Sequence, residues 1–199
     1  MEIQIQSLIF LYVVILFSAV IHEYFHAWTA DMLGDRTARM AGRLTINPIA
    51  HMDLWGTVML PLLMMSFFKI FIGYAKPVPF NPYNIKNKHG TLLVGLAGPT
   101  ANMLIAIIFG IVLRLFFSAS PFGSLIALIV YINIFLALFN LIPIPPLDGS
   151  KLITEILPYR WRMMWQDSFV GIFVAVMIAF WILPKIASFF YLLITGQSF

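Results

Sequence analysis

Hydrophobic residues are concentrated in five long stretches, and the charged residues lie mostly in the connectors between them. The stretches cover about residues 5–33, 55–72, 91–117, 124–141 and 165–183, and a shorter one follows at 186–194. Each of the five approaches or exceeds the roughly 17–25 residues that a membrane-spanning helix requires. Helices are the expected conformation, because a helix satisfies its own backbone hydrogen bonds in lipid. The pattern predicts an all-α polytopic membrane protein.

The composition agrees with this fold class. Of the 199 residues, 61% are hydrophobic and 10% are charged, whereas roughly 25% are charged in an ordinary soluble domain. Such a chain cannot cover its surface with polar groups, which excludes a soluble globular domain, and its apolar content excludes disorder. The absence of cysteine excludes thiol chemistry. The length predicts a single membrane-embedded domain, residues 1–199, surrounded by the lipid bilayer.

The distribution of basic residues predicts the orientation in the membrane. The connectors 34–54, 73–90 and 142–164 each hold three lysines or arginines, and the link 118–123 holds none. All three basic connectors are cytoplasmic only if 55–72 enters the membrane and returns, and Gly56 and Pro61 weaken that stretch as a straight helix. We therefore predict four crossing helices and a re-entrant 55–72. The net charge of +4 indicates orientation rather than nucleic-acid binding.

Two alternatives remain open for this topology. The stretch 55–72 could be a plain fifth crossing that breaks the charge rule. The short stretch 186–194 could cross, lie flat at the interface or pack back on the core.

The first stretch contains His22-Glu23-Tyr24-Phe25-His26, an H-E-x-x-H pattern. Residues at i and i+4 share one face of a helix, so both imidazoles can reach one Zn²⁺. Glu23 stands beside the first ligand, where a carboxylate can accept a proton from water. A pair of hydrogen-bonded core histidines is the alternative, but ionisable groups inside a membrane are costly and rarely idle. The pattern favours a metal site toward the cytoplasmic end of this helix.

A third protein ligand is expected, since a catalytic zinc usually has three. The segment NLIPIPPLDG at 140–149 follows the fourth of the apolar stretches, and its prolines cannot continue a regular helix. Asp148 would then lie at a depth similar to that of the histidines. Capping of the following helix is the alternative role for this aspartate, and the two roles do not exclude each other.

These motifs resemble the site-2 protease family of intramembrane zinc metalloproteases. The matching residues are HEYFH at 22–26, GPTAN at 98–102 and NLIPIPPLDG at 140–149. No PDZ-like or CBS-like insert is expected, so the chain resembles the minimal form of the family. The resemblance implies one Zn²⁺ per chain, bound by His22, His26 and Asp148.

The resemblance also implies catalytic roles for three residues. Glu23 would act as general base and then as proton donor to the leaving amine. Asn102 or Asn140 would donate a hydrogen bond to the oxyanion, although membrane asparagines also serve as interhelical packing contacts. The implied reaction is hydrolysis of a peptide bond in or near the transmembrane segment of a single-span membrane-protein substrate, with the active site toward the cytoplasm.

Two other functions remain as alternatives. An intramembrane zinc transporter would need histidine and acidic residues along a whole path, whereas here they cluster at one depth. An inactive protease-like scaffold would normally tolerate the loss of Glu23, which is present here.

Two further polar segments have no settled role. Residues 73–82 are predicted to be extended, because residues before proline avoid the helical region. We hypothesise that this segment offers a strand edge to an unwound substrate, with an ordinary interfacial loop as the alternative. His51 and Asp53 could support or gate the site, or bind another metal, or serve only as loop-capping and interface residues.

Overall fold

The structure, a computed structural model, describes residues 5–68, 73, 75–118, 120–156 and 169–199. Within these ranges the chain consists of helices joined by turns and loops, and no strand occurs. The all-α prediction is therefore confirmed. The chain divides into two compact units, Met1–Gly90 and Thr91–Phe199. The prediction of a single domain stays a prediction.

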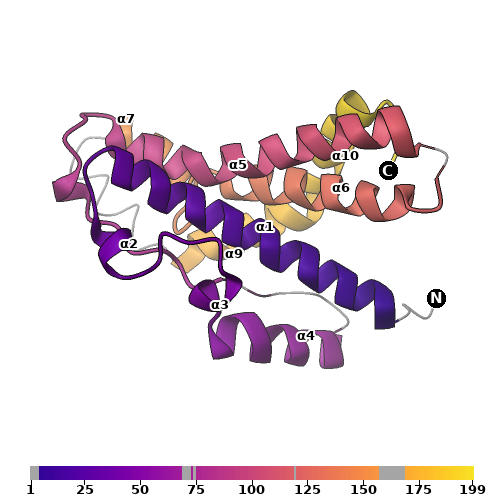
Figure 1. Cartoon of the computed structure of the whole chain (residues 1–199), viewed down its shortest axis with the longest axis horizontal. Helices are drawn as coiled ribbons and strands as arrows, with labels where there is room; N and C mark the ends of the chain where they lie inside the picture. Colours follow the sequence, from indigo (N-terminus) through magenta and orange to yellow (C-terminus); the bar gives the residue numbers. More distant parts are fainter. Residues whose placement is uncertain (1–4, 69–72, 74, 119, 157–168) are drawn as a thin grey trace. The chain divides into compact units, whose positions relative to one another are not determined.

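The N-terminal unit is built on one long apolar helix. This helix, α1, covers Ile5–Met32, and two short helices that follow it, α2 (Thr37–Met40) and α3 (Pro48–His51), pack against it (Figure 1). A π-helical turn, η1 (Leu54–Met59), then leads into α4 (Leu60–Phe68), and a 3-10 turn, η2 (Pro82–Asn84), closes the unit.

The predicted re-entrant stretch begins at a well-defined cap. The Asp53 carboxylate accepts hydrogen bonds from the backbone N–H groups of Trp55 and Gly56, at 3.0 and 2.8 Å, as an N-cap residue does. The apolar helix that follows, Leu54–Phe67, falls in the range of 10–17 residues. Re-entry stays a prediction, and residues 69–72 lie outside the described residues.

A buried aspartate ties the loops of the N-terminal unit to the end of α1. Asp35 is fully buried, and its carboxylate accepts hydrogen bonds from the Thr37 N–H, the Asn81 N–H and the Asn84 amide. Burial by itself would raise the pKa of Asp35, but these hydrogen bonds outweigh it, so the pKa lies below its ordinary value. The charged form is therefore the stabilising one.

We expect Asp35→Asn to lower the free energy of unfolding by about 1–3 kcal/mol at neutral pH, because hydrogen bonds to a charged group are lost. A carboxylate with a depressed pKa contributes stability above its unfolded pKa of about 3.9, and this contribution disappears as the pH falls through the folded pKa. Melting temperatures in detergent should thus differ most at neutral pH and converge below about pH 4. A difference that stayed constant across this range would contradict the interpretation.

The C-terminal unit contains the other helices that the structure describes. They are α5 (Gly90–Val112) with its π-helical end η3 (Leu113–Phe117), α6 (Gly123–Asn140), α7 (Ser150–Ile156), α9 (Phe169–Trp181) and α10 (Leu183–Thr195). The core of this unit forms where α10 packs on α6 (Figure 1), through Ala187 and Tyr191 on one helix and Val130 and Ile134 on the other. Ala187 and Tyr191 of the stretch 186–194 thus lie in this core, and the disposition of the stretch in the membrane stays a prediction.

Three of the described helices are long and apolar enough to cross a membrane: Gln6–Met32, Gly90–Phe117 and Gly123–Asn140. The segments Phe173–Trp181 and Leu183–Thr195 meet at a bend of 49° and pass the same test only as a pair, which would make a fourth span. Pro184 follows this bend, and proline is favoured in a first helical turn. Residues 165–168 of the predicted last crossing lie outside the described residues.

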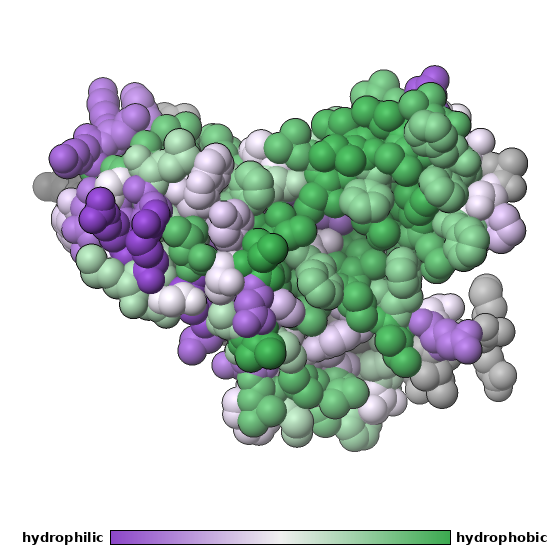
Figure 2. Space-filling view, in the orientation of Figure 1, coloured by the Kyte–Doolittle hydropathy of each residue, from purple (hydrophilic) through white to green (hydrophobic). Residues whose placement is uncertain are grey.

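The surface of these helices is apolar over wide areas, as Figure 2 shows. Large hydrophobic side chains on the outside of α5 alone include Leu93, Leu104, Ile107, Ile108, Phe109 and Ile111. Soluble monomers do not expose contiguous apolar surface on this scale. The helices and their surface belong to a multi-pass membrane protein.

Candidate metal centre

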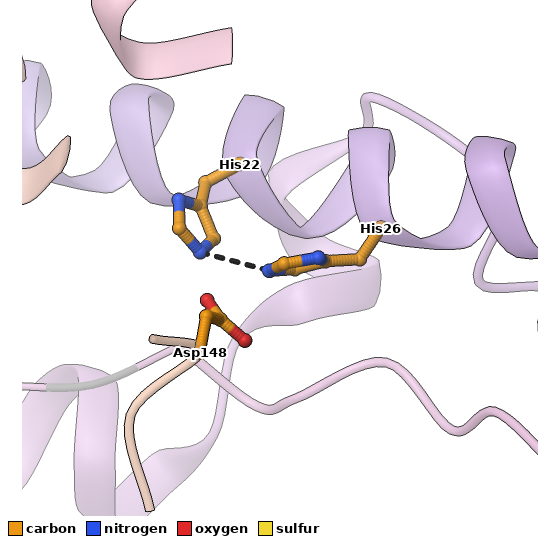
Figure 3. A group of neighbouring side chains, drawn as sticks. All are labelled: His22, His26 and Asp148. Carbon is orange, nitrogen blue, oxygen red and sulfur yellow. Dashed lines mark hydrogen bonds between the residues drawn. The ribbon is translucent and has the colours of Figure 1, made fainter. Parts of the chain in front are cut away.

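The two histidines of the H-E-x-x-H pattern meet on one face of α1. The helix is continuous from Ile5 to Met32, so residues four positions apart stack one turn above the other. The Nε2 atoms of His22 and His26 lie 3.0 Å apart, and the rings meet edge to face, as Figure 3 shows. Two nitrogens bound to one tetrahedral zinc at 2.0–2.1 Å would lie ~3.3 Å apart. The pair therefore presents two converging donors at nearly the required separation.

Glu23 extends from the same helix toward a non-helical segment. Its Oε2 atom accepts a hydrogen bond of 2.7 Å from the backbone N–H of Val78. Pro77 and Pro79 flank this residue and carry no N–H. Residues 75–81 contain no helix or strand. The predicted extended segment therefore contacts the predicted general base directly.

The segment around Val78 is held from the other side by Arg43. The guanidinium donates to the carbonyl oxygens of Lys76 and Pro77, at 2.8 and 3.3 Å, and also to that of Ala50. The Lys76 N–H donates to the His51 carbonyl at 2.9 Å. The N–H groups of Lys76 and Val78 thus already donate hydrogen bonds within the chain, and Pro77 and Pro79 have none. A substrate strand would therefore find only carbonyl acceptors at residues 76–79.

His51 and Asp53 both hold loops in place. The His51 ring is fully buried, and its Nε2 atom lies 2.8 Å from the Thr45 carbonyl. Asp53 caps the helix that begins at Leu54. Of the roles considered for this pair, the geometry shows loop anchoring and capping.

Asp148 lies in a tight turn after α6. The Gly149 N–H donates to the Asn140 carbonyl at 2.6 Å, which returns the chain to the end of the helix. A Cβ on Gly149 would lie 2.2 Å from the Leu141 carbonyl oxygen, so only glycine fits this close approach. The turn places Asp148, also drawn in Figure 3, directly before α7.

The Asp148 carboxylate is paired with a lysine that the sequence analysis missed. Lys151 Nζ lies 2.6 Å from Asp148 Oδ1, and the two side chains are 24% and 13% exposed. Gly95 on α5 leaves room for the lysine stem, because a Cβ there would lie 2.4 Å from Lys151 Cδ. The i, i+3 spacing of the two residues at the start of a helix was the sequence signal that could have predicted this ion pair.

The two asparagines predicted as oxyanion donors differ in their surroundings. Asn102 is fully buried and donates from Nδ2 to the Asn133 Oδ1 atom at 2.9 Å, which joins α5 to α6. Asn140 is half-buried at the end of α6 and donates from Nδ2 to the Leu136 carbonyl at 3.0 Å. Asn133 was not singled out from the sequence, although a polar residue inside an apolar stretch was the signal.

Comparison with known proteins places the chain in a family. The model of peptidase family M50 matches residues 10–123 and 117–184. The chain belongs to peptidase family M50. The resemblance to the site-2 proteases is thereby confirmed.

Curated relatives of this M50 peptidase carry consistent names. YwhC of Bacillus subtilis, named as a candidate zinc metalloprotease, is 34% identical over 173 residues, which are 80% of this chain and 75% of YwhC. Rip2 of Mycolicibacterium smegmatis, named in the same way, is 33% identical over 67% of this chain and 52% of Rip2. A zinc metalloprotease of Methanocaldococcus jannaschii is 27% identical over 76% of this chain and 35% of that protein. The chain thus spans about half the length of Rip2 and less of the archaeal protein. No solved structure gives a significant match.

The family and the relatives confirm the predicted enzyme class, a membrane zinc metalloprotease. The donor types of the predicted ligands fit this metal. His22, His26 and Asp148 can each offer one ligand atom, and two imidazole nitrogens with one carboxylate oxygen form a catalytic zinc set that leaves a position for water or substrate.

Proposed function

We propose that this M50 peptidase hydrolyses peptide bonds in or near the transmembrane segments of single-span membrane proteins. One observation carries the proposal. The Nε2 atoms of His22 and His26 converge to 3.0 Å on a helix that is apolar and long enough to cross a membrane. Ionisable side chains are rarely placed inside a membrane without a function. A metal site on such a helix would lie at the depth where the transmembrane segments of substrates are found.

The chain would hold one zinc ion through His22, His26 and Asp148. When bound there, the ion supplies Lewis acidity that activates water and polarises the scissile carbonyl. Lys151 pairs with one oxygen of the Asp148 carboxylate, and the other oxygen is the one proposed to act as the ligand. Outer partners of this kind orient a ligand before the metal arrives.

Glu23 is the proposed general base. The Val78 N–H occupies its Oε2 atom, so Oε1 is the oxygen proposed to accept the proton of the attacking water and to pass it to the leaving amine. General acid–base catalysis needs the carboxylate within hydrogen-bonding distance of that water. A fixed carboxylate meets this requirement better than a freely rotating one.

Of the two asparagines, Asn140 is the proposed oxyanion donor. It ends α6 at the turn that carries Asp148 and is only half-buried, so its amide can turn toward a substrate. The burial of Asn102 and its bond to Asn133 favour a packing role for that residue. We propose that the site lies toward the cytoplasmic face, since α1 leads from Glu23 into the basic connector 34–54 and Val78 lies within the basic connector 73–90.

The proposal is tested with single-span reporter peptides in detergent. We expect cleavage within the reporter span, its loss on addition of a membrane-permeant zinc chelator, and its return with one equivalent of zinc. A reporter whose span contains Gly and Pro should be cleaved faster than an all-Leu span, because a stable helix hides its carbonyl groups. Zinc flux into proteoliposomes without cleavage would overturn the proposal in favour of a transporter, and the absence of both would leave the inactive scaffold.

A further inference from the structure

The peptide unit between Pro77 and Val78 is bound at both ends by side chains. Its carbonyl oxygen accepts from Arg43 at 3.3 Å, and its N–H donates to Glu23 Oε2 at 2.7 Å. The C=O and N–H groups of a trans peptide point in opposite directions across one rigid plane. A cation and a carboxylate therefore grip opposite sides of a single planar unit.

We propose that this peptide unit positions the Glu23 carboxylate for proton transfer and that Arg43 is the positioning residue that holds it. The inference rests on the proposed function, because it assigns a geometric requirement to the base named there. It adds two groups, the Val78 amide and the Arg43 guanidinium, to those that the reaction needs.

The local sequence provides one donor and no competing one. Prolines at 77 and 79 leave Val78 with the only backbone N–H of these three residues. The proline rings fix φ at residues 77 and 79, which limits the movement of the donor between them. A hydrogen bond to an ionised carboxylate is stronger than a neutral one, so this amide restricts the rotamers of Glu23.

The contact with Arg43 also makes the Val78 N–H a stronger hydrogen-bond donor. A guanidinium on the carbonyl oxygen polarises the peptide and strengthens the bond at its other end, as in any hydrogen-bonded chain at low dielectric. Arg43 also binds the carbonyls of Ala50 and Lys76, so the guanidinium joins α3 to the segment that carries Val78. Its own Nε atom is buried without a partner among the described residues, which indicates that the residue is oriented for its terminal nitrogens.

Lysine could not replace this arginine. An ammonium group is a single point of charge and lacks the planar fork that reaches several carbonyls in fixed directions. We therefore expect Arg43→Lys to recover only part of the activity that Arg43→Met loses.

The deciding experiment compares Val78→Pro with Val78→Ala on a reporter peptide that the wild-type enzyme cleaves. The alanine variant shortens the side chain and keeps the N–H. The ratio of the two kcat values therefore measures the contribution of the residue 78 N–H to catalysis. We expect V78P to have a kcat about 100-fold below that of V78A, since a 1 Å misplacement of a catalytic group can cost that much. KM should stay within about 3-fold and zinc content at one equivalent, because the amide contacts the base and not the substrate or the metal.

A second set of variants, at Arg43, tests the inference even if V78P does not fold. Arg43→Met should lower kcat with KM and zinc content retained, whereas Arg39→Met, which removes an arginine from an exposed pair with Asp31, should leave kcat unchanged. If Arg43 acts through the amide, the double variant V78P/R43M should be no slower than V78P alone. Equal kcat values for V78P and V78A, additive effects in the double variant, or zinc loss together with kcat would each overturn the inference.

The failure of the inference is distinguishable from that of the proposed function. Wild type and Glu23→Gln are measured in the same assay. If the wild type cleaves and E23Q does not, the proposed function holds whatever V78P shows. If the wild type does not cleave, the proposed function has failed.

Discussion

We expect Glu23→Gln to lower kcat by at least ~100-fold and to leave one zinc ion bound, because only the general base is lost. Glutamine has nearly the same shape as glutamate and keeps an oxygen that can accept the Val78 N–H, which is 2.7 Å from Glu23 Oε2 in the wild type. Only the capacity to take a proton is removed. Zinc content by elemental analysis and cleavage of a single-span reporter measure the two consequences separately.

The matched control for this variant is Asp31→Asn on the same helix. Asp31 pairs with the exposed guanidinium of Arg39 through two hydrogen bonds, of 2.9 and 2.6 Å, and it lies beyond the H-E-x-x-H pattern near the end of α1. The control makes the same carboxylate-to-amide change without reaching the histidines, so its kcat should stay within about 2-fold of wild type. An E23Q enzyme that still cleaved at more than a tenth of the wild-type rate would remove Glu23 from the mechanism.

We expect Asp148→Asn to weaken zinc binding more than any change outside the three proposed ligands. A neutral amide oxygen is a poorer donor than a carboxylate, and the site loses its one anionic ligand. We expect the affinity, measured by competition with a chromogenic chelator, to fall by more than ~100-fold. This exceeds the roughly 10–100-fold that the loss of an outer partner costs.

Lys151→Met is the matched comparison. It keeps the carboxylate and the length of the stem beside Gly95 but removes the ammonium that lies 2.6 Å from Asp148 Oδ1. Its zinc affinity should therefore fall between those of the wild type and D148N. If D148N bound zinc as tightly as the wild type did, Asp148 would not be a ligand, and the proposed third position would belong to another group.

The variants E23Q and D148N also distinguish the protease from the two alternative functions. A transporter with these ligands would lose zinc flux in D148N, yet it would have no cleavage to lose in E23Q. An inactive scaffold would bind zinc and cleave nothing in any variant. Only a protease combines retained zinc with abolished cleavage in E23Q.

The sequence alone determined the fold class and the enzyme family. Long apolar stretches specify helices in lipid because no water is present to pair with an open backbone, and i, i+4 spacing on a helix specifies that His22 and His26 meet. Both predictions follow from local periodicity, which the tertiary structure cannot change without breaking the helix. The prolines at 143, 145 and 146 likewise indicated that the helix ends before Asp148.

Contacts between segments distant in the sequence were decided only by the tertiary structure. Nothing in the spacing or the types of these residues predicts that the peptide unit before Val78 lies between the side chains of Arg43 and Glu23. The pairings of Asp35 with Asn81 and of Asn102 with Asn133 are of the same kind. The physical reason is that hydrogen bonds of loops and buried amides depend on where the chain returns, and that is set by packing over the whole unit, whereas helical periodicity is set within a single turn.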